Sequence, residues 1–510
     1  MNDQAEKLDV LIIGAGISGI GMAYNMLKNR KGDTFSVIES RDNIGGTWDF
    51  FKYPGLRSDS DMYTFAYSFK PWRHREYIGS AERINAYLKE VVDENDIREK
   101  IRFQTRITSA NWDSNLNVWK LQATKGDGES YLIHAKFLVT CTGYYNYEQG
   151  YLPKFEGSDD FTGDIIHPQK WPENYDYANK KVVVIGSGAT AFTVVPTIAK
   201  KTAHVTMLQR SPAYLYNRPA SDSLFKILSK FLPANVTNKI MRIKYVCLQQ
   251  LSYGLSKRFP TFTKKMLIGD IQKAAGNQVD IGKHFTPKYE PWDQRVCMVP
   301  DNDMFEAVKR GEASIKTEEI TRFTKKGILL KTGEELEADL IVPATGLDLQ
   351  LWGGMNLEVD GVPVKAANLT NYKGMMFSQM PNMVSIFGYT NASWTLKAEL
   401  SYDYVCRLLN FMDKNNHQSV FPYLSQNQNS ESESLVSLKS GYVLRAQDKL
   451  PKQGNSFPWC NKDFYMSDLL AIKHSKLNDN VLKFDKNSVL ADFHGADEGL
   501  GNSAKKAASA

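Results

Sequence analysis

The sequence predicts an α/β fold, and three observations predict it. An apolar, β-branched run at residues 9–13 leads into a glycine-rich turn and then a helical pattern, which is typical of a buried parallel strand followed by a helix. The run at 181–185 repeats this arrangement, about 172 residues after the first. Between 215 and 280 the alternation stops and the pattern becomes helical. We therefore expect two βαβ units and one helical insertion.

The first unit has the spacing of a dinucleotide-binding turn. Gly14, Gly16 and Gly19 follow the first strand, and a second strand at 35–39 ends at Glu39, 20 positions beyond Gly19. In such a turn Gly14 permits the tight bend, Gly16 lets the backbone approach a pyrophosphate, and Gly19 lets the helix pack on the strand. The helix N-terminus favours phosphate, and Glu39 is placed to accept hydrogen bonds from ribose hydroxyls. The unit therefore predicts a Rossmann-like domain, which we assign to FAD.

The second unit differs from the first at two positions. Gly186 and Gly188 keep the glycine spacing, but the third position is Ala191. Arg210, rather than an acidic residue, follows the second strand of the unit. A guanidinium at this place suits a 2′-phosphate and favours NADPH over NADH. Two units of this kind in one chain indicate electron transfer from a nicotinamide to a flavin.

The length of 510 residues exceeds what one ordinary core supports, so several domains are expected. A strand at 137–141 belongs to the first unit, and a strand at 340–344 belongs to the second. The predicted order is the first part of the FAD domain at 1–148, the first part of the NADP domain at 149–214, the helical insertion at 215–282, the second part of the NADP domain at 283–375, the second part of the FAD domain at 376–490, and a tail at 491–510. We also expect a polar surface loop at 425–434.

Composition excludes several classes of protein. The net charge of +6 is too small for its length to suggest a nucleic-acid partner. No uninterrupted apolar stretch is long enough for a membrane span, and the first apolar run is too short for a signal peptide. The cysteines are scattered without a CxxC pair, so we expect no disulfide framework and no metal site in a cytoplasmic protein; they are Cys141, Cys247, Cys297, Cys406 and Cys460.

Residues 161–172, FTGDIIHPQKWP, identify a family. This segment is similar to the FxGxxxHxxxWP fingerprint of the type I Baeyer–Villiger flavin monooxygenases, and it lies between the two nucleotide units. The resemblance extends over roughly 8–485, through the segments 45–48, 52–72, 285–295, 344–346 and 388–400. It is strongest toward the branch that holds the mycobacterial activator of thioamide prodrugs and the flavin monooxygenases of long-chain alkane degradation.

The resemblance implies a reaction and the residues that perform it. Members of the family consume NADPH and O2 and convert ketones to esters through a C4a-peroxyflavin on FAD. Arg295 matches the active-site arginine of the family, and Asp59 matches the carboxylate that orients it. The family pattern also implies cofactor contacts at the positions that match its two nucleotide sites, namely Gly46, Thr47, Trp48, Asp59, Tyr63, Ser187, Ala189, Thr190 and Ser211.

The fingerprint itself has a different expected role. In the family it lies in the linker between the nucleotide domains, so we expect it to couple domain movement to the NADP cycle rather than to supply an acid or base; its residues are Phe161, Gly163, His167, Trp171 and Pro172. Trp394 is expected either to line the flavin or substrate pocket or to pack in the core. Many members have a lysine before the active-site arginine, and this chain has Gln294 instead, which leaves Arg210 as the main discriminator for NADPH.

Two rival hypotheses remain open alongside ketone oxidation. One is the same fold with S- or N-oxidation or long-chain alkane hydroxylation, which can coexist with ester formation in one enzyme. The other is a flavin reductase of the pyridine nucleotide–disulfide type, which needs a redox CxxxxC pair that this sequence lacks. A nucleotide-binding regulator without turnover fits less well, because it would consume no NADPH.

The helical insertion is unusually basic. Between Asp222 and Lys273 it has ten lysines and arginines against two aspartates, with apolar residues at helical spacing. One interpretation is a helix pair whose apolar face covers the active site. The other is a surface that also contacts an anionic membrane, peripheral to the inner face, from which a hydrophobic long-chain ketone would arrive.

Overall fold

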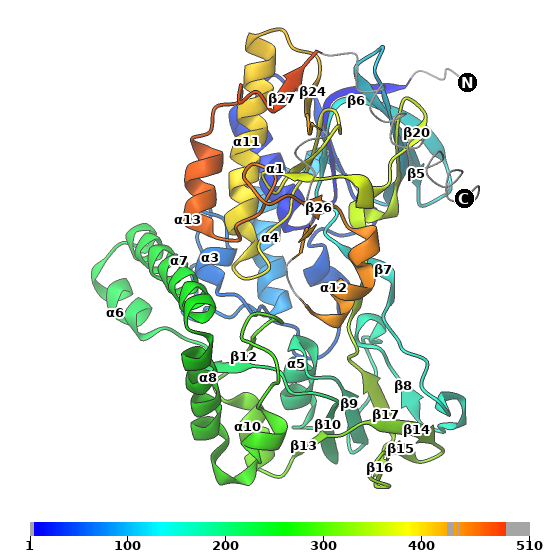
Figure 1. Ribbon diagram of the computed structural model, residues 1–510, viewed down its shortest axis with the longest axis vertical. Helices are drawn as coiled ribbons and strands as arrows, with labels where there is room; N and C mark the ends of the chain where they lie inside the picture. The colour runs from blue at the N-terminus through cyan, green and yellow to red at the C-terminus, as the bar shows by residue number, and fades with distance from the viewer. Residues whose placement is uncertain (1–4, 426–432, 437–438, 486–510) are drawn as a thin grey trace, which may run out of the picture.

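The computed structural model describes residues 5–425, 433–436 and 439–485, and it has two α/β domains stacked along the long axis of the molecule (Figure 1). A nine-stranded sheet forms the first domain, in the order β20-β19-β4-β5-β6-β1-β2-β3, with β23 also paired to β6. Its strands are β1 (Glu6–Ile13), β2 (Phe35–Ile38), β3 (Ile101–Arg102), β4 (Thr105–Asp113), β5 (Val118–Lys125), β6 (Ser130–Thr140), β19 (Asn356–Val359), β20 (Val362–Pro363) and β23 (Met383–Ser385).

The centre of this sheet is the predicted βαβ unit. Strands β2, β1 and β6 run parallel, and α1 (Ile17–Asn29) packs against α11 (Trp394–Lys414) from near the other end of the chain. The remaining helices of the first domain are α2 (Thr47–Phe50), α3 (Met62–Phe65), α4 (Ala81–Glu94), α12 (Gly441–Ala446) and α13 (Tyr465–Asp468). Because the sheet is covered on both faces by large apolar clusters, β2 and the last four residues of β1 and of β6 are buried.

The second domain has a five-stranded parallel sheet in the order β13-β10-β9-β17-β8. Its strands are β8 (Asp164–Ile165), β9 (Lys181–Ile185), β10 (His204–Gln209), β13 (Ala313–Thr317) and β17 (Leu340–Pro343). Helices α5 (Ala189–Ile198) and α10 (Asp303–Lys309) and a small antiparallel sheet complete the domain, the latter made of β14 (Ile320–Thr324), β15 (Gly327–Leu330) and β16 (Glu335–Glu337). The two strands that pass between the domains, β7 (Tyr145–Gly150) and β18 (Leu347–Leu349), pair with each other.

The chain returns to the first domain earlier than the sequence predicts. Strand β19 pairs in parallel with β4 of the first sheet, so 356–363 belong to the first domain and the expected boundary at 375 is too late. These strands are only four and two residues long and have no continuous apolar run, so no periodicity marks them. Part of the expected polar loop lies outside the described residues, and 433–434 form β25, which pairs with β26 (Lys452–Gln453). The expected tail at 491–510 also lies outside the described residues.

The insertion is helical, as predicted, but its apolar face points the other way. It lies between β11 (Leu215–Arg218) and β12 (Cys297–Pro300) and comprises α6 (Ser223–Phe231), α7 (Ala234–Arg258), α8 (Pro260–Ala275) and the short α9 (Ile281–His284). Phe225 and Val246 are buried, whereas Phe231, Ile240 and Ile243 are exposed. The inner side of α7 is instead mostly polar or aromatic, with buried Thr237, Asn238, Tyr245 and Gln250 beside the apolar Met241 and Val246. The prediction that the apolar face of the insertion covers the active site is therefore wrong for most of these residues.

Candidate active site between the two nucleotide-binding domains

A single cavity of about 1170 Å³ extends between the two domains, and the ends of both predicted βαβ units line it. Parallel strands present their carboxyl ends at one edge of a sheet, where α/β proteins bind their ligands. Here the edges of the two sheets face each other, so one continuous space meets both glycine-rich turns. Such an arrangement lets two bound groups approach each other.

The first glycine turn has the geometry that the sequence predicts. Gly14 has φ +103°, and a Cβ there would lie 2.6 Å from the carbonyl oxygen of Cys141. A Cβ on Gly19 would lie 1.8 Å from the carbonyl oxygen of Gly14, so only glycine allows α1 to pack this closely. By contrast, within the described residues a Cβ on Gly16 would meet only Gly46, at 3.5 Å from its Cα and 3.8 Å from its N, so the space beside Gly16 is open to the cavity.

Glu39 lies at the end of β2 and is buried. Its Oε2 accepts a hydrogen bond from the backbone N–H of Ala15 at 2.8 Å, and its Oε1 accepts one from Arg41 N at 2.9 Å. These contacts hold the carboxylate at the cavity wall beside the glycine turn. The group fits a ribose that continues from a pyrophosphate at the N-terminus of α1.

The next predicted contacts divide into two groups. Gly46, Thr47 and Trp48 line the cavity opposite Gly16, and the Thr47 hydroxyl lies 3.3 Å from that of Tyr147. Tyr63 is not among the residues that line the cavity. Its ring is buried among Tyr77, Phe225 and Tyr245, so the expected contact of the Tyr63 side chain with a cofactor is not supported.

The second glycine turn is open in the same way. Gly186 has φ +143°, and a Cβ there would lie 2.5 Å from the carbonyl oxygen of Ala344, whereas a Cβ on Gly188 would meet nothing within 4 Å. The remaining predicted contacts at the start of α5 and after β10 also line the cavity; they are Ser187, Ala189, Thr190, Arg210 and Ser211. Arg210 is exposed and forms no ion pair with any residue in the described parts of the chain, so its charge is available to an anionic ligand.

The central charged pair joins the two domains. Arg295 Nε lies 2.7 Å from Asp59 Oδ2, and Arg295 Nη2 donates to Asp59 Oδ1 at 2.8 Å. Such a two-point contact fixes the plane of the guanidinium. The charge of Asp59 raises the pKa of Arg295 above its ordinary value, so the arginine stays cationic. Its Nη1 makes no hydrogen bond or ion pair within the described residues, which leaves those donors to the cavity.

The fingerprint residues lie at the linker and in the second domain rather than together at one wall. His167 lines the cavity and lies against Gly150 of β7, where a Cβ would come within 2.1 Å of His167 Cε1. Burial lowers the pKa of His167, so it is neutral near pH 7. The others lie outside the cavity: Phe161 packs on Phe323, Gly163 approaches the Asp339 carbonyl, Trp171 is buried beside Tyr175 and Tyr177, and Pro172 is exposed.

Trp394 has both of the expected environments. It lines the cavity and also packs against the main apolar cluster of the first domain. Its Nε1 donates to Ser18 Oγ at 2.8 Å, and its ring stacks on Tyr144 with 5.5 Å between the ring centroids. The indole is therefore fixed in orientation at the cavity wall.

Sequence reasoning missed several residues of this cavity. Arg57 lines it and forms an ion pair of 2.6 Å with Asp303 of α10, a second charged contact between the domains. Residues 440–442 and Arg445, around α12, close another side, and the Arg445 guanidinium lies 3.4 Å from the centroid of the Tyr151 ring. Arg57 lies in a segment already linked to the site and could have been found there, whereas α12 has no motif that would have indicated it.

Comparison with known proteins decides the family. A family model described as pyridine nucleotide-disulphide oxidoreductase matches residues 11–244. The protein named "probable FAD-binding monooxygenase AlmA" of Acinetobacter baylyi is 47% identical over 482 residues, which are 94% of this chain and 97% of the relative. The FAD-containing monooxygenase EthA of Mycobacterium tuberculosis is 44% identical over 482 residues, 94% of this chain and 98% of the relative. The chain belongs to the FAD-containing monooxygenases.

Solved structures give the same fold for this monooxygenase. An oxidized steroid monooxygenase bound to NADP has a TM-score of 0.72 at 23% identity, covering 94% of this chain and 99% of the other. The OTEMO complex with FAD and NADP has a TM-score of 0.68 at 23% identity, covering 83% and 87%. The predictions of the family, of an α/β fold with FAD- and NADP-type domains, and of a flavin-dependent monooxygenase are thereby confirmed. No helix in the described parts of the chain is long and apolar enough to cross a bilayer.

Proposed function

We propose that this monooxygenase converts hydrophobic ketones to esters at the cavity between its domains. The overall reaction takes a ketone, O2, NADPH and H⁺ to an ester, NADP⁺ and water; one C–C bond of the carbonyl breaks, and both carbons bond to the inserted oxygen. The observation that carries the proposal is the Arg295–Asp59 pair. The Arg295 guanidinium lines the cavity, and its N–H groups that do not contact Asp59 are available to a ligand there. An ester product from a methyl ketone, with NADPH consumed in equal amount, is the test.

The residues present fit both nucleotides. Gly14, Gly16 and the N-terminus of α1 would hold the FAD pyrophosphate in the open space beside Gly16, with Glu39 on the ribose. Gly186, Gly188 and the start of α5 would hold NADPH in the corresponding space, with Arg210 on its 2′-phosphate. FAD when bound takes a hydride from NADPH and activates O2.

Arg295 has a separate role in this proposal, at the oxygen of the ketone. Negative charge develops on that oxygen as the carbonyl carbon is attacked, and a fixed cation with N–H donors stabilises it. Asp59 holds Nε and Nη2, so the remaining donors are oriented before the substrate arrives. Because the pKa of Arg295 is raised, its charge does not change over the working pH range.

The alternative function is S- or N-oxidation or the hydroxylation of long alkanes in the same cavity. The names of the relatives fit either chemistry. A disulfide-type reductase is not favoured, because burial raises the pKa of both cavity thiols, to about 12 for Cys297, and so disfavours the reactive thiolate at Cys141 and Cys297. Products from a methyl ketone and a thioether offered together would separate ketone oxidation from heteroatom oxidation.

We propose that the fingerprint couples the linker to the nucleotide site. His167 Nδ1 accepts from Gln169 N at 3.2 Å, and the Gln169 side chain donates to the carbonyl of Asn146 on β7 at 2.7 Å. These contacts join the fingerprint segment to one of the two strands that pass between the domains. Movement of the second domain would therefore reach the cavity wall through His167.

Replacing Arg210 by alanine should weaken NADPH much more than NADH. The exposed guanidinium has no ion pair within the described residues, and Gln294 at the same cavity adds no charge. One lost charge-assisted contact is worth roughly 1.5–3 kcal/mol, or about 10- to 100-fold in the Michaelis constant for NADPH. Steady-state kinetics with both nucleotides measures this, and an equal loss for NADH would remove Arg210 from the phosphate site.

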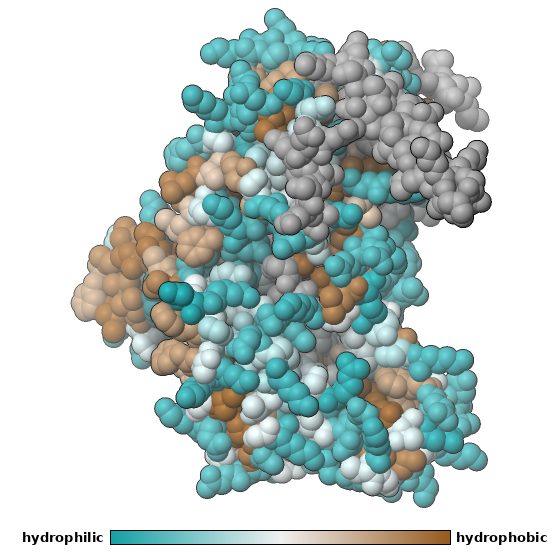
Figure 2. All heavy atoms as spheres, in the orientation of Figure 1, coloured by the Kyte–Doolittle hydropathy of each residue, from teal (hydrophilic) through white to brown (hydrophobic). Residues whose placement is uncertain are grey.

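We infer that the insertion contacts an anionic membrane peripherally. Of 21 exposed large apolar side chains in the described chain, twelve lie between 224 and 266, on α6, α7, the start of α8 and the residue between α7 and α8. Figure 2 shows a hydrophobic patch over α6 and α7 at the left of the molecule. On α7 the exposed apolar side chains recur at 236, 240, 243, 248, 251 and 255, which is one helical stripe facing solvent.

The charged side chains around this stripe that form no ion pair or hydrogen bond within the described chain are all positive. Asp222 pairs with Lys244, and Asp270 accepts from the backbone N–H of Asn217, so both acids between 222 and 273 are engaged. Apart from Lys244 and Arg242, the basic residues form no ion pair within the described chain; they are Lys226, Lys230, Lys239, Lys257, Arg258, Lys264, Lys265 and Lys273. A second copy of this surface would be repelled, whereas anionic lipid would be attracted by about 1 kcal/mol for each basic residue near the bilayer.

Vesicle binding tests the membrane proposal. The protein should sediment with anionic vesicles at low salt and be released by high salt, and neutral vesicles should bind it weakly. The double variant Phe231→Ser and Ile243→Ser should bind roughly tenfold more weakly, because both side chains leave water on insertion. Leu116→Ser is the matched control, since Leu116 is also exposed but lies in the β4–β5 turn. Equal binding by the double variant and the control would contradict the proposal.

A further inference from the structure

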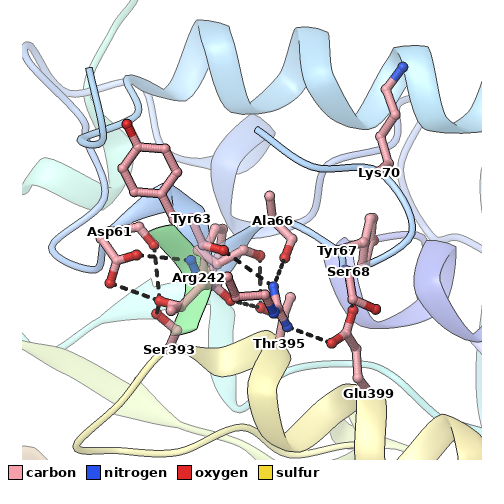
Figure 3. A network of polar contacts seen from close by, with 12 residues as sticks. Asp61, Tyr63, Ala66, Tyr67, Ser68, Lys70, Arg242, Ser393, Thr395 and Glu399 are labelled. Atoms are coloured by element: carbon pink, nitrogen blue, oxygen red, sulfur yellow. Dashed lines mark hydrogen bonds and ion pairs between the residues drawn. The ribbon is translucent and has the colours of Figure 1, made fainter. Parts of the chain in front are cut away.

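Helix α7 contacts the first domain through a small buried polar cluster, which we call the Gln249 clamp. It consists of Asp61, Thr64, Gln249 and Ser393, which come from three separate segments of the chain. Asp61, Thr64 and Ser393 are 6%, 0% and 0% exposed. Figure 3 shows Asp61 and Ser393 close together, with dashed contacts between them. Asp61 precedes α3, Ser393 precedes α11, and Gln249 lies on α7.

Gln249 uses both ends of its amide in the clamp. Its Nε2 donates to Asp61 Oδ2 at 2.6 Å and to Thr64 Oγ1 at 2.9 Å. Its Oε1 accepts from the backbone N–H of Ser393 at 3.2 Å. The Thr64 and Ser393 hydroxyls lie 2.6 Å apart and close the ring of contacts. A single side chain from the insertion therefore joins two segments of the first domain that are 329 residues apart.

The two segments that the clamp joins each continue into the cavity wall. Asp61 comes two residues after Asp59, the partner of Arg295, and its side chain also caps α3 by accepting from Thr64 N at 2.9 Å. Ser393 immediately precedes Trp394, whose ring lines the cavity. The clamp residues themselves do not line the cavity, so any effect of Gln249 on the reaction passes through Asp59 and Trp394.

A second contact holds α7 in place independently of Gln249. Arg242 donates to the carbonyls of Ala66 and Tyr63 at 2.8 and 3.3 Å and pairs with Glu399 at 2.6 Å (Figure 3). In addition, the ring of Tyr253 packs on that of Trp292. Removing the Gln249 amide alone would thus leave the helix attached. The Thr64–Ser393 hydroxyl contact and the bonds from the Thr395 hydroxyl to the carbonyls of Thr64 and Phe65 would remain, so the segments of Asp59 and Trp394 would be loosened but not separated.

We propose that Gln249, which reaches across from the insertion, is a positioning residue for the oxygenation step and fixes the segment of Asp59 relative to that of Trp394 within the first domain. This inference rests on the proposed function for its effect on products, but the clamp itself does not depend on it. Loss of the amide lets the Arg295–Asp59 pair move relative to Trp394 at the cavity wall, and part of the NADPH is then spent on reducing O2 to H2O2 instead of forming ester. Binding of the cofactors is unaffected, because no clamp residue reaches the glycine turns.

The charge of Asp61 gives the clamp a pH signature. Burial raises the pKa of Asp61 to about 6, against the lowering effect of its donors Thr64 and Gln249 and of the Arg242 charge. The other titratable side chains facing it are Tyr63, Tyr77, Tyr216 and Tyr245, and burial raises the pKa of each, so they stay neutral. Asp61 is therefore an anionic acceptor for Gln249 above about pH 6 and loses that character below it.

Three variants of the flavin-loaded full chain test the proposal. Gln249→Leu removes both amide contacts with nearly the same volume. Gln249→Glu places a second carboxyl against Asp61, which is repulsive when both are ionised and attractive when they share a proton. Gln272→Leu is the matched control, because Gln272 is exposed on α8 of the same insertion. The measurements are ester formed per NADPH consumed from pH 5.5 to 8.5, flavin content, and hydrogen exchange of residues 58–66.

For Gln249→Leu we expect the ester yield per NADPH to fall about three- to tenfold at pH 8, with flavin content unchanged and faster exchange in 58–66. Gln249→Glu should show the same loss at pH 8 and recover as the pH falls to about 6, which a residue that only fills space would not do. A Gln249→Leu variant that matches Gln272→Leu in yield and in exchange would overturn the proposal. If the wild type itself forms no ester, the proposed function fails, and the exchange of 58–66 still decides whether the clamp exists.

Discussion

Replacing Arg295 by alanine is expected to lower ester formation by about 10²-fold or more while NADPH still reduces the flavin. The guanidinium is fixed by two contacts to Asp59, and its remaining donors face the cavity. Its loss therefore removes the positive charge that stabilises the negative charge developing on the ketone oxygen. Hydride transfer needs only the two nucleotides side by side, which the glycine turns provide. Anaerobic flavin bleaching by NADPH and ester yield in air measure the two steps separately.

Two further variants make the Arg295 result specific. Arg295→Lys keeps the positive charge but cannot form the two-point contact with Asp59, so it should retain only part of the ester yield. Asp59→Ala should lower ester formation less than Arg295→Ala does, because the positive charge of Arg295 remains but its guanidinium is no longer held in one orientation. Near-normal ester yield in Arg295→Ala would exclude the proposed role, and loss of flavin reduction in the same variant would move Arg295 to the nucleotide site.

Replacing Gly16 by valine is expected to give a colourless protein that folds but binds no FAD. Within the described residues, a Cβ at Gly16 would meet only Gly46, with its Cα at 3.5 Å and its N at 3.8 Å, which are ordinary contacts, so the chain itself tolerates a side chain there. The valine would instead occupy the space where the pyrophosphate must approach the backbone. Absorbance at the flavin bands and a circular-dichroism spectrum measure binding and folding on one sample.

Gly188→Val is the reciprocal control for the second turn. Nothing in the structure lies within 4 Å of a Cβ at this position, so the protein should fold and remain yellow. NADPH should then fail to reduce the bound flavin. A yellow Gly16→Val protein with full flavin content would show that the first unit is not the FAD site, and a colourless Gly188→Val protein would indicate that the two assignments are exchanged.

The fold was predictable from sequence wherever local pattern and burial agree. Strand β9 has the predicted bounds at 181–185, and the first strand, the helices after both glycine turns and the helical insertion all lie where apolar runs and glycine spacing indicate. The short strands β19 and β20 were not predictable, because four and two residues carry no periodicity and their place depends on pairing with β4. Periodicity also shows that a helix has an apolar face but not what covers it, and so the orientation of α7 was missed.

The residues of the candidate site likewise fall into those that a sequence pattern predicts and those that only tertiary packing brings to the cavity. Glycine turns, Glu39 and Arg210 act through the backbone geometry of a βαβ unit, which fixes their positions once the unit is recognised. Arg295 and Asp59 are 236 residues apart in the sequence, and only the family resemblance predicted that they act together. In the structure Arg295 Nε lies 2.7 Å from Asp59 Oδ2. Gln249 and Arg445 have no motif and reach the site through tertiary packing alone, which sequence patterns do not encode locally.

The central claim is that this monooxygenase inserts an oxygen atom from O2 into a C–C bond of a ketone, and oxygen labelling tests it most directly. The purified flavoprotein would be given NADPH, ¹⁸O2 and a long-chain methyl ketone together with a thioether, and the products analysed by mass spectrometry. The account predicts an ester with one ¹⁸O in its bridging position for each NADPH consumed, with or without sulfoxide. NADPH consumed with labelled sulfoxide and unchanged ketone, across a series of ketone chain lengths, would contradict it.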